Sequence, residues 1–68
     1  MKTEERLSRA GWQFAGSYAY LEIMKRGKQN ILFDRNVDEI RLVYGEGITP
    51  YKPIGIEIEL LCTEEDVG

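Results

Sequence analysis

The sequence lacks histidine altogether and contains a single cysteine, Cys62. Histidine is the commonest general base and a frequent zinc ligand, and a cysteine without a neighbouring imidazole or cation keeps an unreactive thiol. We therefore expect no catalytic residue, no metal and no cofactor, and the protein is predicted not to be an enzyme. Because one cysteine cannot form a disulfide within the chain, a reducing, cytoplasmic location is also expected.

Long apolar runs are missing too. No stretch approaches the roughly 20 apolar residues that span a bilayer, and the N-terminal MKTEERLSRAGW carries charges where a signal peptide needs an apolar region. A chain of 68 residues makes one domain and buries only about 60% of the surface that its unfolded form exposes. We expect a single small domain over residues 1–68, a frayed acidic tail over 63–68, and extra burial from a partner or a second copy.

The first ten residues have the features of a short helix. Thr3 can act as its N-cap, and Glu4 and Glu5 fall in the first turn, where the helix dipole favours carboxylates. Gly11 can end the helix, and Leu7 lies on its apolar side. One helix of this length needs a sheet on which to pack.

The segments YAYLEIMK and NILFD predict a β-hairpin, because both are rich in aromatic and branched residues and a glycine-containing KRG stands between them. With a three-residue loop over Lys25–Gly27, Leu21 faces Ile31 and Ala19 faces Phe33. This register gathers the odd-numbered apolar residues on one face, which we expect to be the core face.

Two further runs, EIRLVY and IGIEIEL, alternate apolar and polar residues and predict two more strands. The apolar positions expected on the core face are Ile40, Leu42, Tyr44, Ile54, Ile56, Ile58 and Leu60. Every connection is short, as in neighbouring antiparallel strands. The fold class is therefore α+β, a short N-terminal helix packed on an antiparallel sheet of about four strands, and a fifth short strand over residues 12–15 stays open.

The PYKP segment favours a stiff, extended loop before the last predicted strand, because each proline restricts the residue before it. Its spacing also matches the PxxP ligands that bind aromatic grooves. We interpret the prolines as punctuation and keep Tyr51, which stands between them, as a contact candidate.

Two acidic patterns resemble chemical sites. Glu57 and Glu59 share a predicted strand face, as paired carboxylates do in glycosidases, but no cleft accompanies them. Asp34, Asn36 and Asp38 have the spacing that opens a calcium-binding loop, but the required glycine and the closing glutamate are missing. We interpret the first pattern as a solvated face and the second as a turn.

A second apolar face is predicted opposite the core, and one short helix cannot cover both. Its expected apolar members are Tyr18, Tyr20, Met24, Leu32, Val43 and Leu61. Aromatic residues and methionine edged by charges are typical of protein interfaces. The preferred hypothesis is a non-enzymatic adaptor or inhibitor that binds another protein and also self-associates, as a homodimer. Its candidate partner-binding residues are Tyr18, Tyr20, Met24, Val43, Tyr51, Glu57, Glu59 and Leu61.

The alternative hypothesis is a small nucleic-acid-binding module. Its candidate residues are the basic ones of the hairpin loop and the N-terminal helix: Arg6, Arg9, Lys25, Arg26 and Lys28. The net charge of −3 is mild, but residues 53–68 contain acidic residues and no basic one, and this end of the chain repels phosphate. Salt separates the two hypotheses, because phosphate contacts weaken steeply as salt is added and apolar contacts do not.

Overall fold

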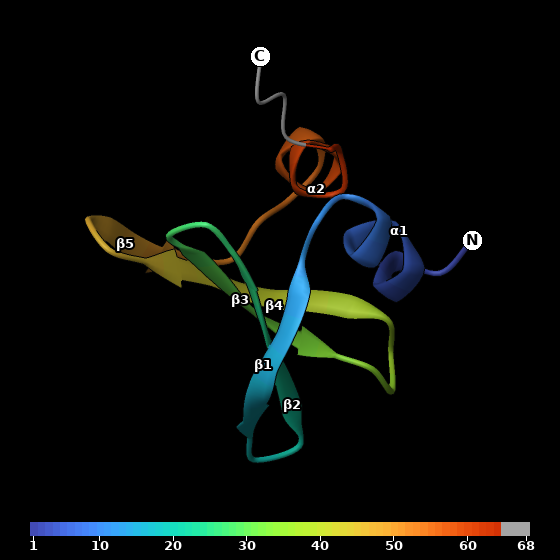
Figure 1. Cartoon of the computed structure of the whole chain (residues 1–68), viewed down its shortest axis with the longest axis horizontal. Helices are drawn as coiled ribbons and strands as arrows, with labels where there is room; N and C mark the ends of the chain where they lie inside the picture. Colours follow the sequence, from blue (N-terminus) through green and yellow to red (C-terminus); the bar gives the residue numbers. More distant parts are fainter. Residues whose placement is uncertain (65–68) are drawn as a thin grey trace.

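The computed structural model describes residues 1–64 of the chain. In order, its elements are α1 (Thr3–Arg9), β1 (Gln13–Tyr18), β2 (Leu21–Arg26), β3 (Gln29–Asp34), β4 (Glu39–Gly45), β5 (Ile48–Tyr51) and α2 (Ile56–Leu61). The strands form one five-stranded antiparallel sheet in sequential order, β1-β2-β3-β4-β5 (Figure 1). This confirms the α+β class with an N-terminal helix, and β1 is the strand that the sequence left open. Of the predicted tail, residues 65–68 lie outside the described part.

Helix α1 is capped from a distant turn and not by Thr3. The backbone N–H groups of Thr3 and Glu4 donate to the carboxylate of Asp38, at 2.8 and 3.3 Å. Asp38 belongs to the β3–β4 turn and has a φ of 55°, a conformation that aspartate tolerates better than most residues. The DRNVD turn therefore holds the N-terminus of α1 against the sheet.

The β2–β3 hairpin has a different register from the predicted one. Its loop consists of two residues, Gly27 and Lys28, and Gly27 supplies the positive φ of 61° that a tight type II′ hairpin turn requires at its first position. Met24 consequently pairs with Ile31, where Leu21 was predicted. An odd shift in register turns every side chain of a strand to the other face, so the even-numbered residues of β2 face the core.

The β1–β2 turn lies where the sequence predicted a strand. Ala19 and Tyr20 form this turn, and Glu22 takes the place opposite Phe33 that was predicted for Ala19. Ala19 has a φ of 56°. This left-handed conformation costs a residue with a Cβ atom about 1–2 kcal/mol, a cost that glycine does not have. The shape of this hairpin is therefore imposed by the pairing of its strands and not by the preference of the turn.

Strand β4 contains a β-bulge that interrupts its alternation. Arg41 is the extra residue where the register against β3 shifts. Ile40 before it and Val43 after it are both buried in the core, although they are three positions apart. Leu42 and Tyr44, predicted on the core face, lie on the other face. The predicted alternation is correct at Ile40 and wrong beyond the bulge.

Most of the IGIEIEL segment is helical, because α2 covers Ile56–Leu61, so the strand predicted over 54–60 is wrong. Ile58, Leu61 and Cys62 have the spacing that places residues on one face of a helix, and this face packs on the core. Leu60, predicted in the core, is 63% exposed. Ile54 and Ile56, also predicted in the core, are 67% and 75% exposed. The alternation is too short to exclude a helix, and the helix buries Leu61 against the core.

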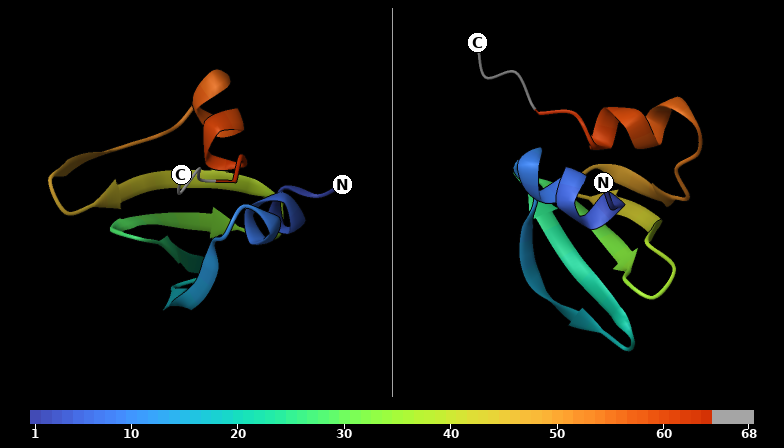
Figure 2. Two further views of the ribbon diagram at one scale, coloured as in Figure 1. Left: turned by 45° about the horizontal axis from the view of Figure 1, so that its top comes forward. Right: turned by 90° about the vertical axis from the view of Figure 1, so that its right-hand side faces the viewer.

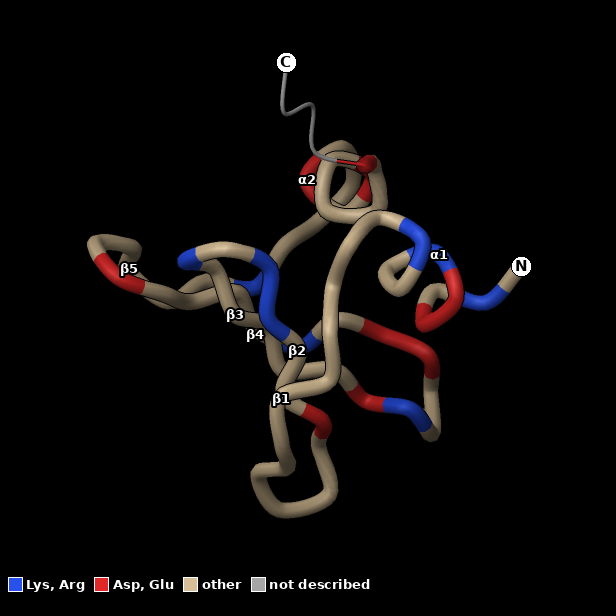
Figure 3. The backbone as a smooth tube through the Cα atoms, in the orientation of Figure 1, with Lys and Arg blue, Asp and Glu red and all other residues tan. Residues whose placement is uncertain are grey.

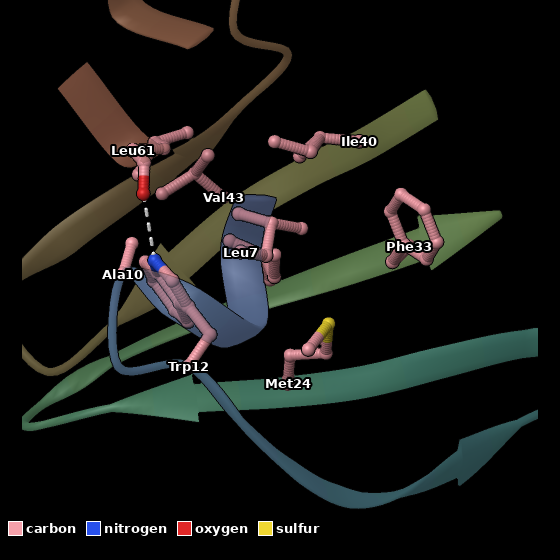
Figure 4. Packing of buried hydrophobic residues seen from close by; sticks show 9 residues of the cluster. Leu7, Ala10, Trp12, Met24, Phe33, Ile40, Val43 and Leu61 are labelled. Carbon is pink, nitrogen blue, oxygen red and sulfur yellow. Dashed lines mark hydrogen bonds between the residues drawn. The ribbon is translucent and has the colours of Figure 1, made fainter. Parts of the chain in front are cut away.

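Both helices cover the same face of the sheet (Figure 2). The buried cluster between them and the strands consists of Leu7, Ala10, Trp12, Met24, Ile31, Phe33, Ile40, Val43 and Leu61. Figure 4 shows these side chains converging, with the indole N–H of Trp12 donating to the Leu61 carbonyl oxygen at 2.8 Å. A second link joins the helices directly, because Arg6 Nη2 lies 2.6 Å from Glu59 Oε2.

Candidate functional site: an apolar groove on the uncovered face

The face of the sheet opposite the helices carries an apolar groove of about 370 Å³. We call it the outer groove, and its lining residues are Tyr18, Ile23, Leu32, Leu42, Tyr44 and Pro50. Within residues 1–64, both helices pack on the opposite face, as the two views of Figure 2 show. The outer groove is therefore open to solvent along its length in this part of the chain.

Strand register builds the floor of the groove. Gly16 pairs with Ile23, Ile23 with Leu32, and Leu32 with Leu42, so these four residues form one row across four strands. Residues directly opposite one another on a sheet face pack side by side. Gly16 has no side chain, and a Cβ atom there would meet nothing closer than Ile23 Cδ1 at 4.0 Å. The row is therefore apolar throughout and recessed at β1.

Two tyrosines and a proline form the walls. Tyr18 ends β1 and is 66% exposed, whereas Tyr44 on β4 is half-buried. Pro50 lies in the short edge strand β5, a position that suits a residue without a backbone N–H. Tyrosine combines a large apolar ring with a hydroxyl that tolerates water. Such walls suit a surface that is wet in one state and covered in another.

An ion pair lies beyond Leu32 on β3. Asp34 is two residues beyond Leu32 on β3 and only 4% exposed. Its carboxylate accepts from Arg41 Nη2 at 3.1 Å and from the Asn36 N–H at 3.0 Å. The guanidinium of Arg41 supplies the charge that a buried carboxylate needs. The bulge that inverts β4 therefore also places the counter-ion of Asp34.

Asp34 and Asp38, whose spacing resembles that of a calcium-binding loop, have separate partners. Asp34 binds Arg41, whereas Asp38 caps α1. Among residues 1–64, no group of three acidic or cysteine side chains converges in a way that would hold a metal ion. Burial opposes ionisation of Asp38, but hydrogen bonds from the Thr3 and Glu4 backbone lower its pKa below the ordinary value. Both carboxylates are thus engaged by the fold itself.

Three of the predicted partner-binding residues are buried and not exposed. Met24, Val43 and Leu61 belong to the core cluster. The expectation that they lie on the free face is wrong for three reasons: the two-residue turn inverts β2, the bulge inverts β4, and the last segment is a helix. In each case the residue is apolar and buries its side chain, but on the face opposite to the one that the sequence predicted.

The other predicted contact residues are spread over the surface. Tyr18 lies in the outer groove, and Tyr20 stands exposed at the β1–β2 turn. Tyr51 pairs with Val43, which faces the core, so it does not line the groove. Glu57 and Glu59 lie on α2, on the helical side of the sheet. Only Tyr18 of these five is a groove residue.

Sequence reasoning assigned Leu32 to the free face correctly but missed most of its neighbours. Ile23, Leu42 and Tyr44 were predicted on the core side, and Pro50 was interpreted as punctuation. A two-residue hairpin reading of Gly27-Lys28 would have recovered Ile23. No sequence signal marks the bulge that moves the two β4 residues.

Arg26, a candidate for nucleic-acid binding, has structural contacts. Its guanidinium lies over the Trp12 ring, 4.8 Å from the centroid. Its Nη1 donates to the carbonyl oxygens of Ala10 and Thr63, at 3.0 and 2.8 Å. Cation–π contact and two carbonyl bonds connect β2 to the ends of both helices. The side chain is thus committed within the molecule.

The other basic candidates do not form one surface. Arg6 pairs with Glu59, and the hydrogen bond to Glu59 is the main reason why the pKa of its guanidinium is raised. Arg9 is exposed on α1, whereas Lys25 and Lys28 are exposed at the β2–β3 end of the sheet (Figure 3). A phosphate backbone needs a continuous basic stripe. These basic residues are separate charges and do not form such a stripe.

Cys62 has the environment of an unreactive thiol. It is half-buried and packs against the core cluster next to α2. Burial raises its pKa, and the nearby Glu59 raises it further, while Arg6 acts in the opposite direction without compensating. A thiolate is the nucleophilic form. The thiol therefore stays protonated at neutral pH.

None of the helices in residues 1–64 combines the length and the apolar character needed to cross a membrane. Comparisons with protein-family models, with curated proteins and with solved structures find no match. The outer groove must therefore be interpreted from its own geometry and chemistry.

Proposed function

We propose that this chain is a non-enzymatic, cytoplasmic protein-binding module, an adaptor or inhibitor, whose contact surface is the outer groove. The observation that carries the proposal is an apolar row across four strands, walled by tyrosines, on a face that neither helix covers. Interface centres are enriched in aromatic residues and depleted of charge, which matches this lining.

The small size of the domain supports the same proposal. A chain of this length buries a limited core, and any partner that binds only the folded form adds to its stability. Ile23, Leu32 and Leu42 are only half-buried in the isolated chain. Covering them would bring apolar area out of water at about 25 cal/mol per Å².

A display selection tests the proposal. Random peptides and small protein fragments are selected on the immobilised chain, at a coupling density low enough to keep single copies apart. We expect enriched binders that lose affinity for Leu32→Lys but keep it for Leu60→Lys. Leu60 is exposed and Leu32 is half-buried, neither belongs to the core cluster, and only Leu32 lines the groove. Failure to enrich any binder, or binders equally indifferent to both changes, would contradict the proposal.

Nucleic-acid binding has less support, because Arg6 and Arg26 are engaged within the molecule. Lys25 and Lys28 remain exposed at one end of the sheet. A fluorescent oligonucleotide titrated at low salt decides the matter. Binding that falls steeply with added salt and disappears in a double change of Lys25 and Lys28 to Gln would favour this function.

A further inference from the structure

We infer that the occupant of the outer groove is a second copy of this chain, packed face to face about a two-fold axis that runs parallel to β3 beside Leu32. The inference rests on the proposed protein-binding function and names the partner. Two sheets that pack face to face keep their strands within about 30° of each other and stand about 10 Å apart. The question is whether the outer face complements itself under this operation.

The apolar row is self-complementary about this axis. β3 is the middle strand of five, so rotation about it brings β2 opposite β4 of the second copy. Ile23 then meets Leu42 of the second copy, and Leu32 meets its own equivalent. β1, recessed at Gly16, comes opposite β5, which carries Pro50. Gly16 lies at the level of Leu32, whereas Pro50 lies at the level of Tyr44, so the self-complementarity that an isologous interface requires rests on the row of Ile23, Leu32 and Leu42.

The next polar row also matches itself. Asn30 pairs with Lys25 on one side and with Tyr44 on the other, so all three lie at one level of the sheet. The two-fold axis brings Lys25 over the Tyr44 ring of the second copy, where a cation–π contact forms. Asn30 meets its equivalent, and an amide both donates and accepts hydrogen bonds.

The acidic residue nearest the axis does not oppose this packing. Asp34 lies on β3 as well, and the axis brings it toward its own equivalent. Its carboxylate is 4% exposed and bound to Arg41. Each copy therefore presents at this end an Asp34 carboxylate bound to Arg41, whose Nη1 also lies 3.6 Å from Glu39 Oε2, and not a bare Asp34 carboxylate.

The available area indicates a modest affinity. Five strands about 4.8 Å apart and about six residues long cover roughly 480 Å² in projection. The relief of the side chains increases this value, and a standard interface buries about 800 Å² on each partner. Such an interface would take about a sixth of the 4804 Å² accessible surface of the chain. We therefore expect a dimer at the small end of the stable range, with a dissociation constant in the micromolar region.

Sedimentation equilibrium between roughly 5 and 500 µM, the range in which small interfaces dissociate, tests the inference. We expect the apparent mass to rise from one chain to two. Leu32→Lys should weaken dimerisation at least about thirtyfold, since it places two charges against each other at the centre of the interface. Leu60→Lys on α2, the matched control, should dimerise like the wild type. Circular dichroism and the fluorescence of Trp12 check that both variants fold.

Isotope-filtered NOEs on a mixture of labelled and unlabelled chains test the axis itself. Within one chain β3 separates Ile23 from Leu42, about 9.6 Å at sheet spacing, so an intermolecular NOE between their methyl groups supports the two-fold packing. A chain that stays monomeric, or a dimer that Leu60→Lys breaks and Leu32→Lys does not, would overturn the inference. If the monomeric chain still selects Leu32-dependent binders, the proposed function stands and only the second copy is wrong.

Discussion

The two faces of one sheet differ in what covers them more than in what they contain. Phe33 and Ile31 are fully buried beneath the helices, whereas Leu32, between them on the same strand, lines an open groove. All three are large apolar residues on the central strand. An apolar residue in a strand thus shows that a face is prepared for burial, and the position of the helices decides which face is buried within the chain.

The largest expected effect comes from truncating a buried side chain on β3. Phe33→Ala should lose about 3–5 kcal/mol of unfolding free energy, because it leaves a cavity in a packed core. A core in a domain of this size rarely supplies more than about 3–5 kcal/mol in total, so we expect Phe33→Ala to be largely unfolded. Urea denaturation followed by the fluorescence of Trp12, which the core buries, provides the measurement.

Leu32→Ala is the matched variant on the other face. In dilute solution it should cost about 1 kcal/mol or less, as for most surface positions. At concentrations where copies associate, the cost should increase, because the wild type gains stability from binding and the variant does not. Equal losses for Phe33→Ala and Leu32→Ala in dilute solution would show that both faces are buried within one chain.

An intermediate effect is expected where α1 is held over the core face. Asp38→Ala removes the acceptor of two backbone N–H groups and should cost about 0.5–2 kcal/mol, as other N-cap removals do. Since hydrogen bonding holds the pKa of Asp38 below its ordinary value, this stabilisation is present above about pH 4, the unfolded pKa, and is lost as the pH falls through the lower folded pKa.

The difference in unfolding free energy between wild type and Asp38→Ala should therefore shrink as the pH falls below about 4, the unfolded pKa, and through the lower folded pKa. Denaturation at several pH values measures it. Glu46→Ala, an exposed change in the β4–β5 turn, serves as the control and should show no comparable trend. A constant difference down to pH 2 would mean that the carboxylate charge does not stabilise α1.

The smallest effect is expected at the turn that begins β2. Ala19→Gly relieves a positive φ but increases the entropy of the unfolded chain, so we expect a net gain of less than about 1 kcal/mol. Thermal unfolding can detect it. Ala15→Gly in the same hairpin lies in strand β1 and should destabilise. A loss at both positions would indicate that the Ala19 conformation carries no strain.

The sequence predicted the elements of this fold better than their orientation. The α+β class, the N-terminal helix and the hairpin segments follow from composition and periodicity. The faces do not, because they depend on a two-residue turn at Gly27 and one extra residue at Arg41. The first changes the hairpin register by three positions and the second changes that of β4 by one, and an odd shift leaves the apolar pattern unchanged while it turns the side chains to the other face.

The same errors in assigning faces affected the prediction of the candidate site. Tyr18 and Leu32 were placed on the free face correctly, whereas Met24 and Val43 were expected there and are in the core. The predicted last strand failed for a related reason, since IGIEIEL alternates and can also form one turn-and-a-half of helix. Which period prevails depends on contacts with Trp12 and the sheet, and these are tertiary.

The bond from Trp12 to Leu61 spans 49 positions and has a consequence for the order of folding. The hairpins of the meander form through local contacts, whereas closing this long loop requires most of the chain to be in place. Because α2 follows all five strands in the chain, a chain emerging from the ribosome completes its sheet before the second covering helix appears. Until then the core face has only α1 to cover it. Before α2 is synthesised, both faces of the sheet therefore expose apolar side chains to which another chain can bind.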